Sequence, residues 1–104
     1  MRRGEVWWAQ LPHPIGRRPV VLLSRDEAYT VRNAVTVAEV TTTIRGIPVE
    51  VSLGPEDGLS KRCVVNVDTL ATIRKELLTE RITILSREKI EQIDQAIKFA
   101  LSLL

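Results

Sequence analysis

Two clusters of polar side chains stand at the ends of apolar, strand-like segments of the chain. Arg17 and Arg18 come directly before an apolar run, and three threonines, Thr41, Thr42 and Thr43, close another. An arginine side chain offers a planar fork of N–H donors that matches a phosphate group, and a threonine hydroxyl can donate a further hydrogen bond. If the fold brings the two clusters together, they form a cradle for one phosphate. The same residues also fit a simpler interpretation, in which the arginines are solvated and the threonines only favour a strand.

The chain lacks the motifs of the common catalytic sites. It contains no nucleophile elbow, no P-loop and no zinc-binding helix motif, and its single histidine, His13, lies between prolines. With one cysteine, Cys63, and no cluster of carboxylates, we expect no disulfide, no metal ion and no cofactor. Cleavage of RNA is one of the few reactions open to such a chain, because the ribose 2′-hydroxyl supplies the nucleophile. The protein need only align that hydroxyl, move protons and stabilise the charge on the reacting phosphate.

Each candidate residue has its own task in that chemistry. Arg18 is permanently cationic, so we expect it to stabilise the pentavalent phosphate rather than to carry protons. Thr41 would donate to a phosphate oxygen or to the leaving 5′-oxygen. Two residues are candidates for acid–base work: Glu39, which shares a strand face with Thr41, and His13, because histidine is the usual proton carrier near neutral pH. Both also fit ordinary roles, as a surface acid and a loop histidine. Cys63, inside a strand-like run, is expected to be a buried, unreactive side chain.

Length and composition place the chain among small globular proteins. With 104 residues, 44% of them hydrophobic and 27% charged, it is expected to form one domain, residues 1–104. No apolar run approaches the roughly 20 residues of a membrane-spanning helix, and the first residues do not resemble a signal peptide. We therefore expect a cytoplasmic protein with no membrane association. The net charge is only +2, but the basic excess lies in the first half of the chain and consists of arginine alone, which favours a phosphate-bearing partner.

Hydrophobic periodicity predicts a sheet of short strands followed by one helix. Alternating or β-branched segments, bounded by proline, glycine and polar residues, predict strands at residues 5–11, 18–24, 34–43, 47–53, 62–70, 71–75 and 82–85. Segment 47–53 is expected to pair with 34–43 through a turn at Arg45 and Gly46. After Ser86, a suitable N-cap, isoleucine and leucine recur at helical spacing up to Leu104. The predicted fold class is mainly β (α+β), a small barrel-like sheet of five to seven short strands with a C-terminal amphipathic helix.

Several motifs of the chain, taken together and in this order, are found in one family of proteins. They are Gly4-Glu5-Val6-Trp7, Gly16-Arg17-Arg18-Pro19-Val20-Val21-Leu22-Leu23-Ser24, Val40-Thr41-Thr42-Thr43 and Gly46-Ile47-Pro48-Val49-Glu50-Val51. On these residues the chain resembles, over nearly its whole length, the MazF/PemK-type toxins, which are the mRNA interferases of toxin–antitoxin modules. The resemblance implies a CcdB/PemK-like, SH3-like barrel that works as a homodimer. It also implies an RNA groove at the dimer interface and a MazE-like antitoxin whose acidic segment blocks that groove.

By position, the resemblance also implies roles for individual residues. Arg18 matches the catalytic arginine of the family, and Thr41 matches its catalytic threonine. Arg17 and Arg45 are expected on backbone phosphates, and the full set of expected RNA contacts is Arg17, Thr42, Thr43, Arg45, Asp68 and Thr69. The implied reaction is a metal-independent, sequence-selective cut of single-stranded RNA that leaves a 2′,3′-cyclic phosphate and a 5′-hydroxyl. The chain departs from the family pattern in its short, proline-flanked loop 12–16 and at Thr69, where a glutamine is common.

Two other functions fit a barrel of this kind. A CcdB-like toxin poisons DNA gyrase by binding, but it acts through a tryptophan-containing tail, which the ending Ala100-Leu101-Ser102-Leu103-Leu104 lacks. A non-catalytic SH3-like module would bind RNA without cleaving it, and its binding would survive the loss of Arg18. Both stay open as alternatives to the nuclease.

Overall fold

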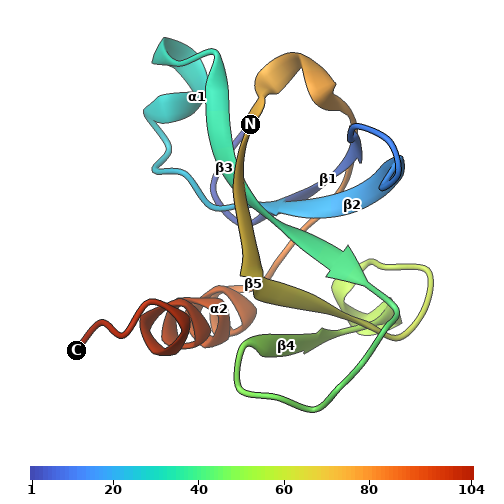
Figure 1. Cartoon of the computed structure of the whole chain (residues 1–104), viewed down its shortest axis with the longest axis vertical. Helices are drawn as coiled ribbons and strands as arrows, with labels where there is room; N and C mark the ends of the chain where they lie inside the picture. Colours follow the sequence, from blue (N-terminus) through green and yellow to red (C-terminus); the bar gives the residue numbers. More distant parts are fainter.

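One strongly curled antiparallel sheet makes up most of the computed structural model, which describes residues 1–104 (Figure 1). Its six strands lie in the order β4-β5-β3-β2-β1-β6. Their bounds are β1 Glu5–Gln10, β2 Arg17–Leu22, β3 Ala34–Thr41, β4 Glu50–Leu53, β5 Cys63–Arg74 and β6 Leu78–Ile84. The helices are α1, Ala28–Val31, and α2, Arg87–Ala100, and two short 3-10 turns cover Pro55–Asp57 and Lys75–Leu77. The predicted class, mainly β with a C-terminal helix, is confirmed.

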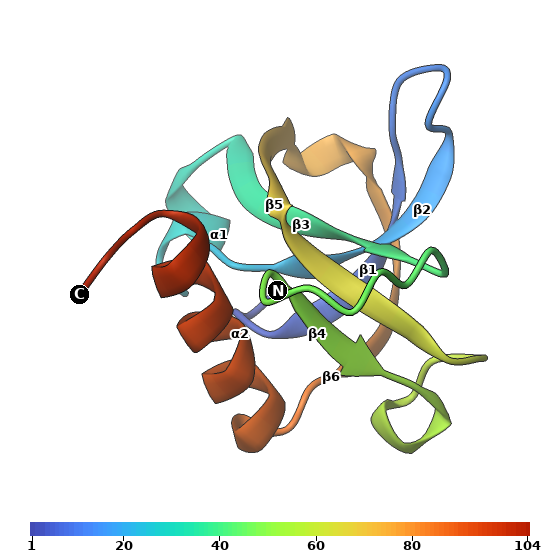
Figure 2. The same ribbon diagram turned by 60° about the horizontal axis from the view of Figure 1, so that its bottom comes forward.

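Both faces of the curled sheet are covered, so the protein has two clusters of buried side chains. The first cluster includes Val21 of β2 and Ile93 of α2, the helix that lies along one side of the sheet (Figure 2). The second cluster, on the other face, includes Val20 and Leu22 of β2 together with Tyr29 of α1. Successive residues of β2 therefore enter opposite clusters, as the period of a strand requires. This explains the unbroken apolar run in β2 and confirms its central position.

The sheet pairs differently from the expectation in one respect. β4 pairs with β5, with Val51 opposite Val65, and not with β3 as predicted from the turn signal. Arg45 and Gly46 do bend the chain, but they belong to the loop 42–49, which carries β4 past β5 to the edge of the sheet. A turn signal determines a local bend, whereas the partner of a strand depends on the whole sheet. Segments 62–70 and 71–75 form one strand, β5, and the last strand, β6, is longer than predicted.

Helix α2 begins as predicted but ends earlier. The Ser86 hydroxyl oxygen accepts a hydrogen bond from the Lys89 N–H at 3.2 Å, which caps the first turn. At the other end, Ser102 takes a left-handed conformation with φ of 58°, and the Leu103 N–H donates to the Lys98 carbonyl at 2.7 Å. The predicted continuation to Leu104 is therefore wrong, and the last leucines, Leu101, Leu103 and Leu104, are exposed. No helix of the chain has both the length and the hydrophobicity that a membrane crossing requires.

Ile93 is the side chain of α2 that contributes most to the buried interior. Replacing it measures how much the helix stabilises the fold. It is fully buried in the first core cluster. We expect Ile93→Ala to lower the free energy of unfolding by about 2–5 kcal/mol, because the lost methyl groups leave a cavity. Urea denaturation measures this change. The matched control is Phe99→Ala on the exposed side of the same helix, where the expected change is within about 0.5 kcal/mol. Equal losses in the two variants would contradict this account of α2.

Candidate active site

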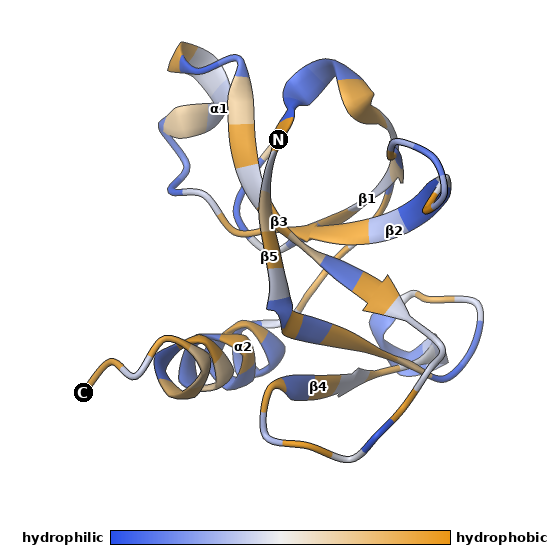
Figure 3. Ribbon diagram, viewed as in Figure 1, coloured by the Kyte–Doolittle hydropathy of each residue, from blue (hydrophilic) through white to orange (hydrophobic).

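The ends of β2 and β3 bring the two predicted polar clusters together. The strands are antiparallel, with Val20 opposite Glu39. Continuing this register by two residues sets Arg18 opposite Thr41, on one face of the sheet. The pairing of the two strands stops at Val20, since the next residue toward the loop, Pro19, has no N–H to donate. In Figure 3 the colour of β2 changes from hydrophobic to hydrophilic toward this end of the strand. Arg18 and Thr41 therefore stand where two core strands become a polar rim.

A cavity without any hydrophobic side chain lies beside Arg18 and Thr41. We call it the polar cavity; its volume is about 250 Å³, and its lining consists of Arg18, Glu39, Thr41, Thr43, Arg45, Asn66 and Thr69. All of these residues except Asn66 were singled out from the sequence. The fold therefore brings together residues from β2, β3, β5 and the loop after β3. This cavity offers guanidinium groups, hydroxyls and one carboxylate within a small volume.

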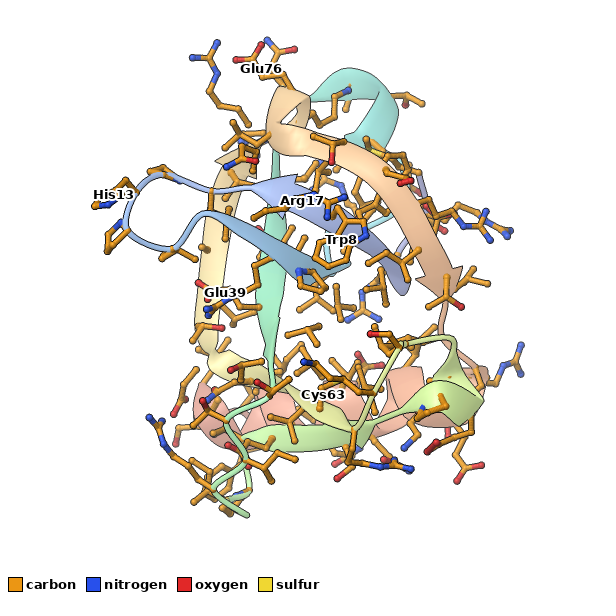
Figure 4. The ribbon with its side chains drawn as sticks, turned by 90° about the vertical axis from the view of Figure 1, so that its right-hand side faces the viewer. Trp8, His13, Arg17, Glu39, Cys63 and Glu76 are labelled. Carbon is orange, nitrogen blue, oxygen red and sulfur yellow. The ribbon has the colours of Figure 1, made fainter.

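A second cavity meets the polar cavity at the same two residues. We call it the tryptophan cavity; its volume is about 260 Å³, and its lining consists of Trp8, Arg17, Arg18, Pro19, Val40, Thr41, Thr42, Leu59, Ser60, Lys61 and Cys63. Figure 4 shows the side of the molecule on which Trp8 and Arg17 lie next to each other. Arg18 and Thr41 line both cavities, so they stand at the border between them. A group bound at these two side chains has access to both cavities.

Arg18 is held in place by one carboxylate. Its Nη1–H donates to Oε1 of Glu39 at 2.9 Å, across the β2–β3 pair. The Arg18 side chain is 37% exposed and that of Glu39 is 18% exposed. A guanidinium has five N–H donors, and this is the only hydrogen bond that the Arg18 guanidinium makes within the protein. The ion pair therefore orients the guanidinium and leaves most of its donors for an anion.

Hydroxyl groups organise the rest of the polar cavity. The Thr41 Oγ1 accepts the N–H of Thr43 at 3.1 Å, which leaves the Thr41 hydroxyl proton available for donation. The Thr69 hydroxyl donates to the Asn66 carbonyl at 2.7 Å and accepts the N–H of Glu39 at 3.1 Å. Thr69 thus supports the backbone of Glu39 where β5 departs from regular pairing with β3. Its predicted contact with RNA stays a prediction.

Two residues of the site were missed from the sequence. Asn66 is buried in β5, where its Oδ1 accepts the N–H of Asp68 at 2.9 Å; its only signal is a polar residue inside an apolar run. Glu50 closes the loop after β3, because its carboxylate accepts the N–H groups of Arg45 and Gly46 at 3.0 and 2.8 Å. The motif Gly46-Ile47-Pro48-Val49-Glu50 could have revealed this contact. Asp68 itself is exposed and lines neither cavity.

His13 lies apart from both cavities. It stands at the tip of the loop between β1 and β2, which projects from the body of the protein (Figures 2 and 4). The loop is closed by the Leu11 N–H, which donates to the Gly16 carbonyl at 2.9 Å, and Gly16 has a φ of 71° that favours glycine. Of the two candidates for acid–base work, only Glu39 is therefore within reach of Arg18 and Thr41 in this chain.

Arg17 and Trp8 form a stacked pair at the wall of the tryptophan cavity. Trp8 is opposite Pro19 in the β1–β2 register, so Arg17 is its diagonal neighbour on the same face. The Arg17 guanidinium carbon lies 4.0 Å from the centre of the Trp8 ring system. Trp7 points to the other face, where its Nε1–H donates to Glu5 Oε1 at 2.9 Å. The two neighbouring tryptophans therefore lie on opposite faces of the sheet.

The only thiol of the chain belongs to a residue that lines the tryptophan cavity, and it is nearly inaccessible. Cys63 is buried, and this burial raises the pKa of its thiol above the usual value, so the reactive thiolate is scarce at neutral pH. We expect iodoacetamide to leave the folded protein unmodified at pH 7 and to alkylate Cys63 rapidly in urea. Mass spectrometry after timed exposure measures both rates. Rapid, stoichiometric alkylation of the folded chain would contradict the structure.

No three His, Cys, Asp or Glu side chains are grouped so that they could hold a metal ion.

Known proteins that resemble this chain agree with the geometry of the site. The sequence pattern of the PemK-like, MazF-like toxins of type II toxin–antitoxin systems matches residues 2–101. The chain belongs to this family. Within the PemK/MazF family, it is 41% identical over 99 residues to the probable endoribonuclease MazF5 of Mycobacterium tuberculosis, covering 94% of this chain and 90% of the relative. It is 28% identical over 112 residues to endoribonuclease EndoA of Bacillus subtilis, covering 100% and 97%.

Solved structures of PemK/MazF proteins share the fold. The Mycobacterium tuberculosis toxin MazF-mt6 superposes with a TM-score of 0.89 at 33% identity, covering 96% of this chain and 98% of that chain. An endoribonuclease in complex with its cognate antitoxin, from a mycobacterial species, gives a TM-score of 0.90 at 29% identity, covering 100% and 97%. The family and the type of toxin predicted from the motifs are confirmed. The predicted small barrel-like sheet with a C-terminal helix is confirmed with them.

Proposed function

We propose that this toxin is an endoribonuclease that cleaves single-stranded RNA, with Arg18 and Thr41 as its catalytic residues. The observation that carries the proposal is the position of these two side chains at the border of two cavities, with the Arg18 guanidinium oriented but most of its donors unused. Relatives that bear the name endoribonuclease support the reaction type. With RNA as its target, we propose that the protein acts in the cytoplasm.

The mechanism follows from what each group can do to a phosphodiester. The ribose 2′-oxygen attacks the adjacent phosphorus, the bond to the 5′-oxygen breaks, and a 2′,3′-cyclic phosphate remains. Negative charge grows on the non-bridging oxygens during this step. The Arg18 guanidinium therefore binds the phosphate more strongly in the transition state than in the ground state. The Thr41 hydroxyl, whose proton is available, donates to the same phosphate. The substrate thus supplies the nucleophile, and the protein supplies alignment and charge.

Glu39 is the group that takes the proton of the 2′-hydroxyl in this proposal. Its carboxylate already lies 2.9 Å from Arg18, in the same cavity as Thr41. A phosphate bound at Arg18 therefore brings the neighbouring ribose to the carboxylate. His13, the other candidate, lines neither cavity. The departing 5′-oxygen takes a proton from solvent, which balances the one given to Glu39.

The partners of the toxin follow from the charge around the site. Arg17, Arg18, Arg45 and Lys61 line the two cavities, whereas Glu39 is the only acid there. We propose that a MazE-like antitoxin places an acidic segment over these cations and so excludes RNA. A related mycobacterial endoribonuclease is known in complex with its cognate antitoxin, which supports this partner. We also propose a homodimer as the working form, with the site open to a groove between the two copies.

The decisive experiment uses the purified chain and a mixed pool of RNA in the presence of EDTA. We expect cuts at one recurring motif, with a 2′,3′-cyclic phosphate on one fragment and a 5′-hydroxyl on the other. Sequencing of the ends maps the motif, and enzymatic end-labelling identifies the termini. RNA that is bound but never cut would favour the non-catalytic binding module. Inhibition of DNA gyrase without RNA cleavage would favour the gyrase poison.

A further inference from the structure

We propose that Arg17 and Trp8 together form a stacking wall for one nucleobase, and that this wall selects the base next to the cleaved bond. This inference rests on the proposed function and assigns the tryptophan cavity a part in it. Arg17 was expected on a backbone phosphate, which any RNA sequence offers equally. A base stacked on Arg17, in contrast, is held with its edge against the other groups that line the cavity, and the base edge is where a protein reads sequence.

The arrangement of the two side chains supports stacking. The Arg17 guanidinium carbon lies over the Trp8 ring, 4.0 Å from its centre. None of the five ion pairs of the chain involves Arg17, so no carboxylate draws it away from the ring. Bases that are not paired in a duplex stack on guanidinium planes as well as on aromatic rings. The outer face of Arg17, backed by Trp8, therefore offers a planar cation to a base.

The size and lining of the tryptophan cavity fit one base. Its volume of about 260 Å³ is slightly below the roughly 300–1,000 Å³ of pockets that hold drug-sized ligands. Leu59 and Val40 supply apolar walls, and Ser60 and Lys61 supply polar groups that a base edge can meet. No acidic side chain lines this cavity, whereas Arg17, Arg18 and Lys61 do. An anionic nucleotide with a flat, partly apolar base matches this lining.

The common border of the cavities places the base relative to the reaction. Arg18 and Thr41, which hold the phosphate in the proposed function, line the tryptophan cavity as well. A nucleotide whose phosphate lies at Arg18 can therefore insert its base beside Arg17. Glu39, the proposed proton acceptor, lines only the polar cavity, so the attacking ribose lies on that side. The selected base thus belongs to the nucleotide across the cleaved bond from the attacking ribose.

The sharpest test replaces Arg17 by lysine, because this change keeps the charge and removes the plane. Arg17 is exposed, so the variant is expected to fold. We expect the affinity for RNA to fall by about 5-fold or more, since stacking of one base contributes about 1–3 kcal/mol. The mapped cleavage motif should lose its preference at one position beside the cut, because the base there is no longer held. The salt dependence of binding should stay unchanged, because the charge is kept. Trp8→Leu should relax the same position, and Trp7→Phe, on the other face of β1, should leave the motif intact.

A binding measurement separates this proposal from the proposed function. RNA with 2′-O-methyl riboses has no free 2′-hydroxyl, so it binds without being cleaved. Fluorescence anisotropy with such oligonucleotides, which differ in one base, should show the base preference in the wild type and its loss in Arg17→Lys. A base preference without any cleavage would support the stacking wall and contradict the proposed nuclease function. Cleavage with an unchanged motif in folded Arg17→Lys and Trp8→Leu proteins would overturn the stacking wall alone.

Discussion

Replacing Arg18 by alanine is expected to abolish RNA cleavage and toxicity to cells while the chain stays folded. The reason is that Arg18 is the cation at the border of the two cavities, with donors free for the phosphate. Removing one group that stabilises transition-state charge typically lowers the rate by on the order of 100- to 1,000-fold, and we expect at least this loss. Initial rates on an RNA that contains the mapped cut site measure it, and circular dichroism shows whether the fold is kept.

Two further variants define what the Arg18 side chain contributes. Arg18→Lys keeps a positive charge but cannot bind a phosphate through two parallel N–H groups, so most of the rate should still be lost. Arg74→Ala removes an equally cationic side chain that is 76% exposed, pairs with Glu76 and lines neither cavity, and it should cleave like the wild type. Full activity of a folded Arg18→Ala protein would remove the proposed site.

The meeting of Arg18 and Thr41 could be predicted from the sequence because it depends on local patterns. One residue begins an apolar strand and the other ends the next strand in the sheet order, and antiparallel neighbours bring these two ends together. The proline after Arg18 marks the place where pairing stops. These signals are carried by adjacent residues, so they are visible without knowledge of the fold.

The pairing of β4 and the length of α2 could not be predicted in the same way. The strand beside β4 is chosen by the curl of the whole sheet, and the hydrophobic pattern of residues 50–53 fits either neighbour. The leucines after Ala100 continue the helical spacing, yet they are exposed and add nothing to the buried core. For β4 the deciding contact is distant in the chain, whereas α2 ends through the left-handed Ser102 and the hydrogen bond from Leu103 to Lys98, which the spacing of apolar residues does not reveal.

Side-chain partners within the site form a third case. Glu39 was found as a candidate from its strand face, but its ion pair with Arg18 joins two strands and depends on their register. The same holds for Arg17, whose stack on Trp8 follows from a diagonal position across β1 and β2. Asn66 had no chemical motif around it at all. The sequence thus identifies which residues gather, and the register decides what each of them touches.

The register also makes Glu39→Gln the most informative test of the reaction step. A glutamine side chain has nearly the same shape, and its amide oxygen can still accept the hydrogen bond from Arg18 that now spans 2.9 Å. It cannot take up the proton of the 2′-hydroxyl. We therefore expect the cleavage rate to fall by about 100- to 10,000-fold, the usual contribution of a general base, while the RNA still binds. Single-turnover cleavage and anisotropy with 2′-O-methyl RNA measure the two effects separately.

The dependence of the rate on pH distinguishes a proton acceptor from a residue that only orients Arg18. If Glu39 accepts the proton, the wild-type pH–rate profile should have a limb that the Glu39→Gln profile lacks, because the bell shape of such a profile reports the essential acid and base. If the carboxylate only orients Arg18, glutamine replaces it with little loss, and the two profiles have the same shape. A His13→Ala variant is the matched control, because this side chain lines neither cavity and its loss should leave the profile unchanged. A profile altered by His13→Ala and unaltered by Glu39→Gln would reassign the base to the loop.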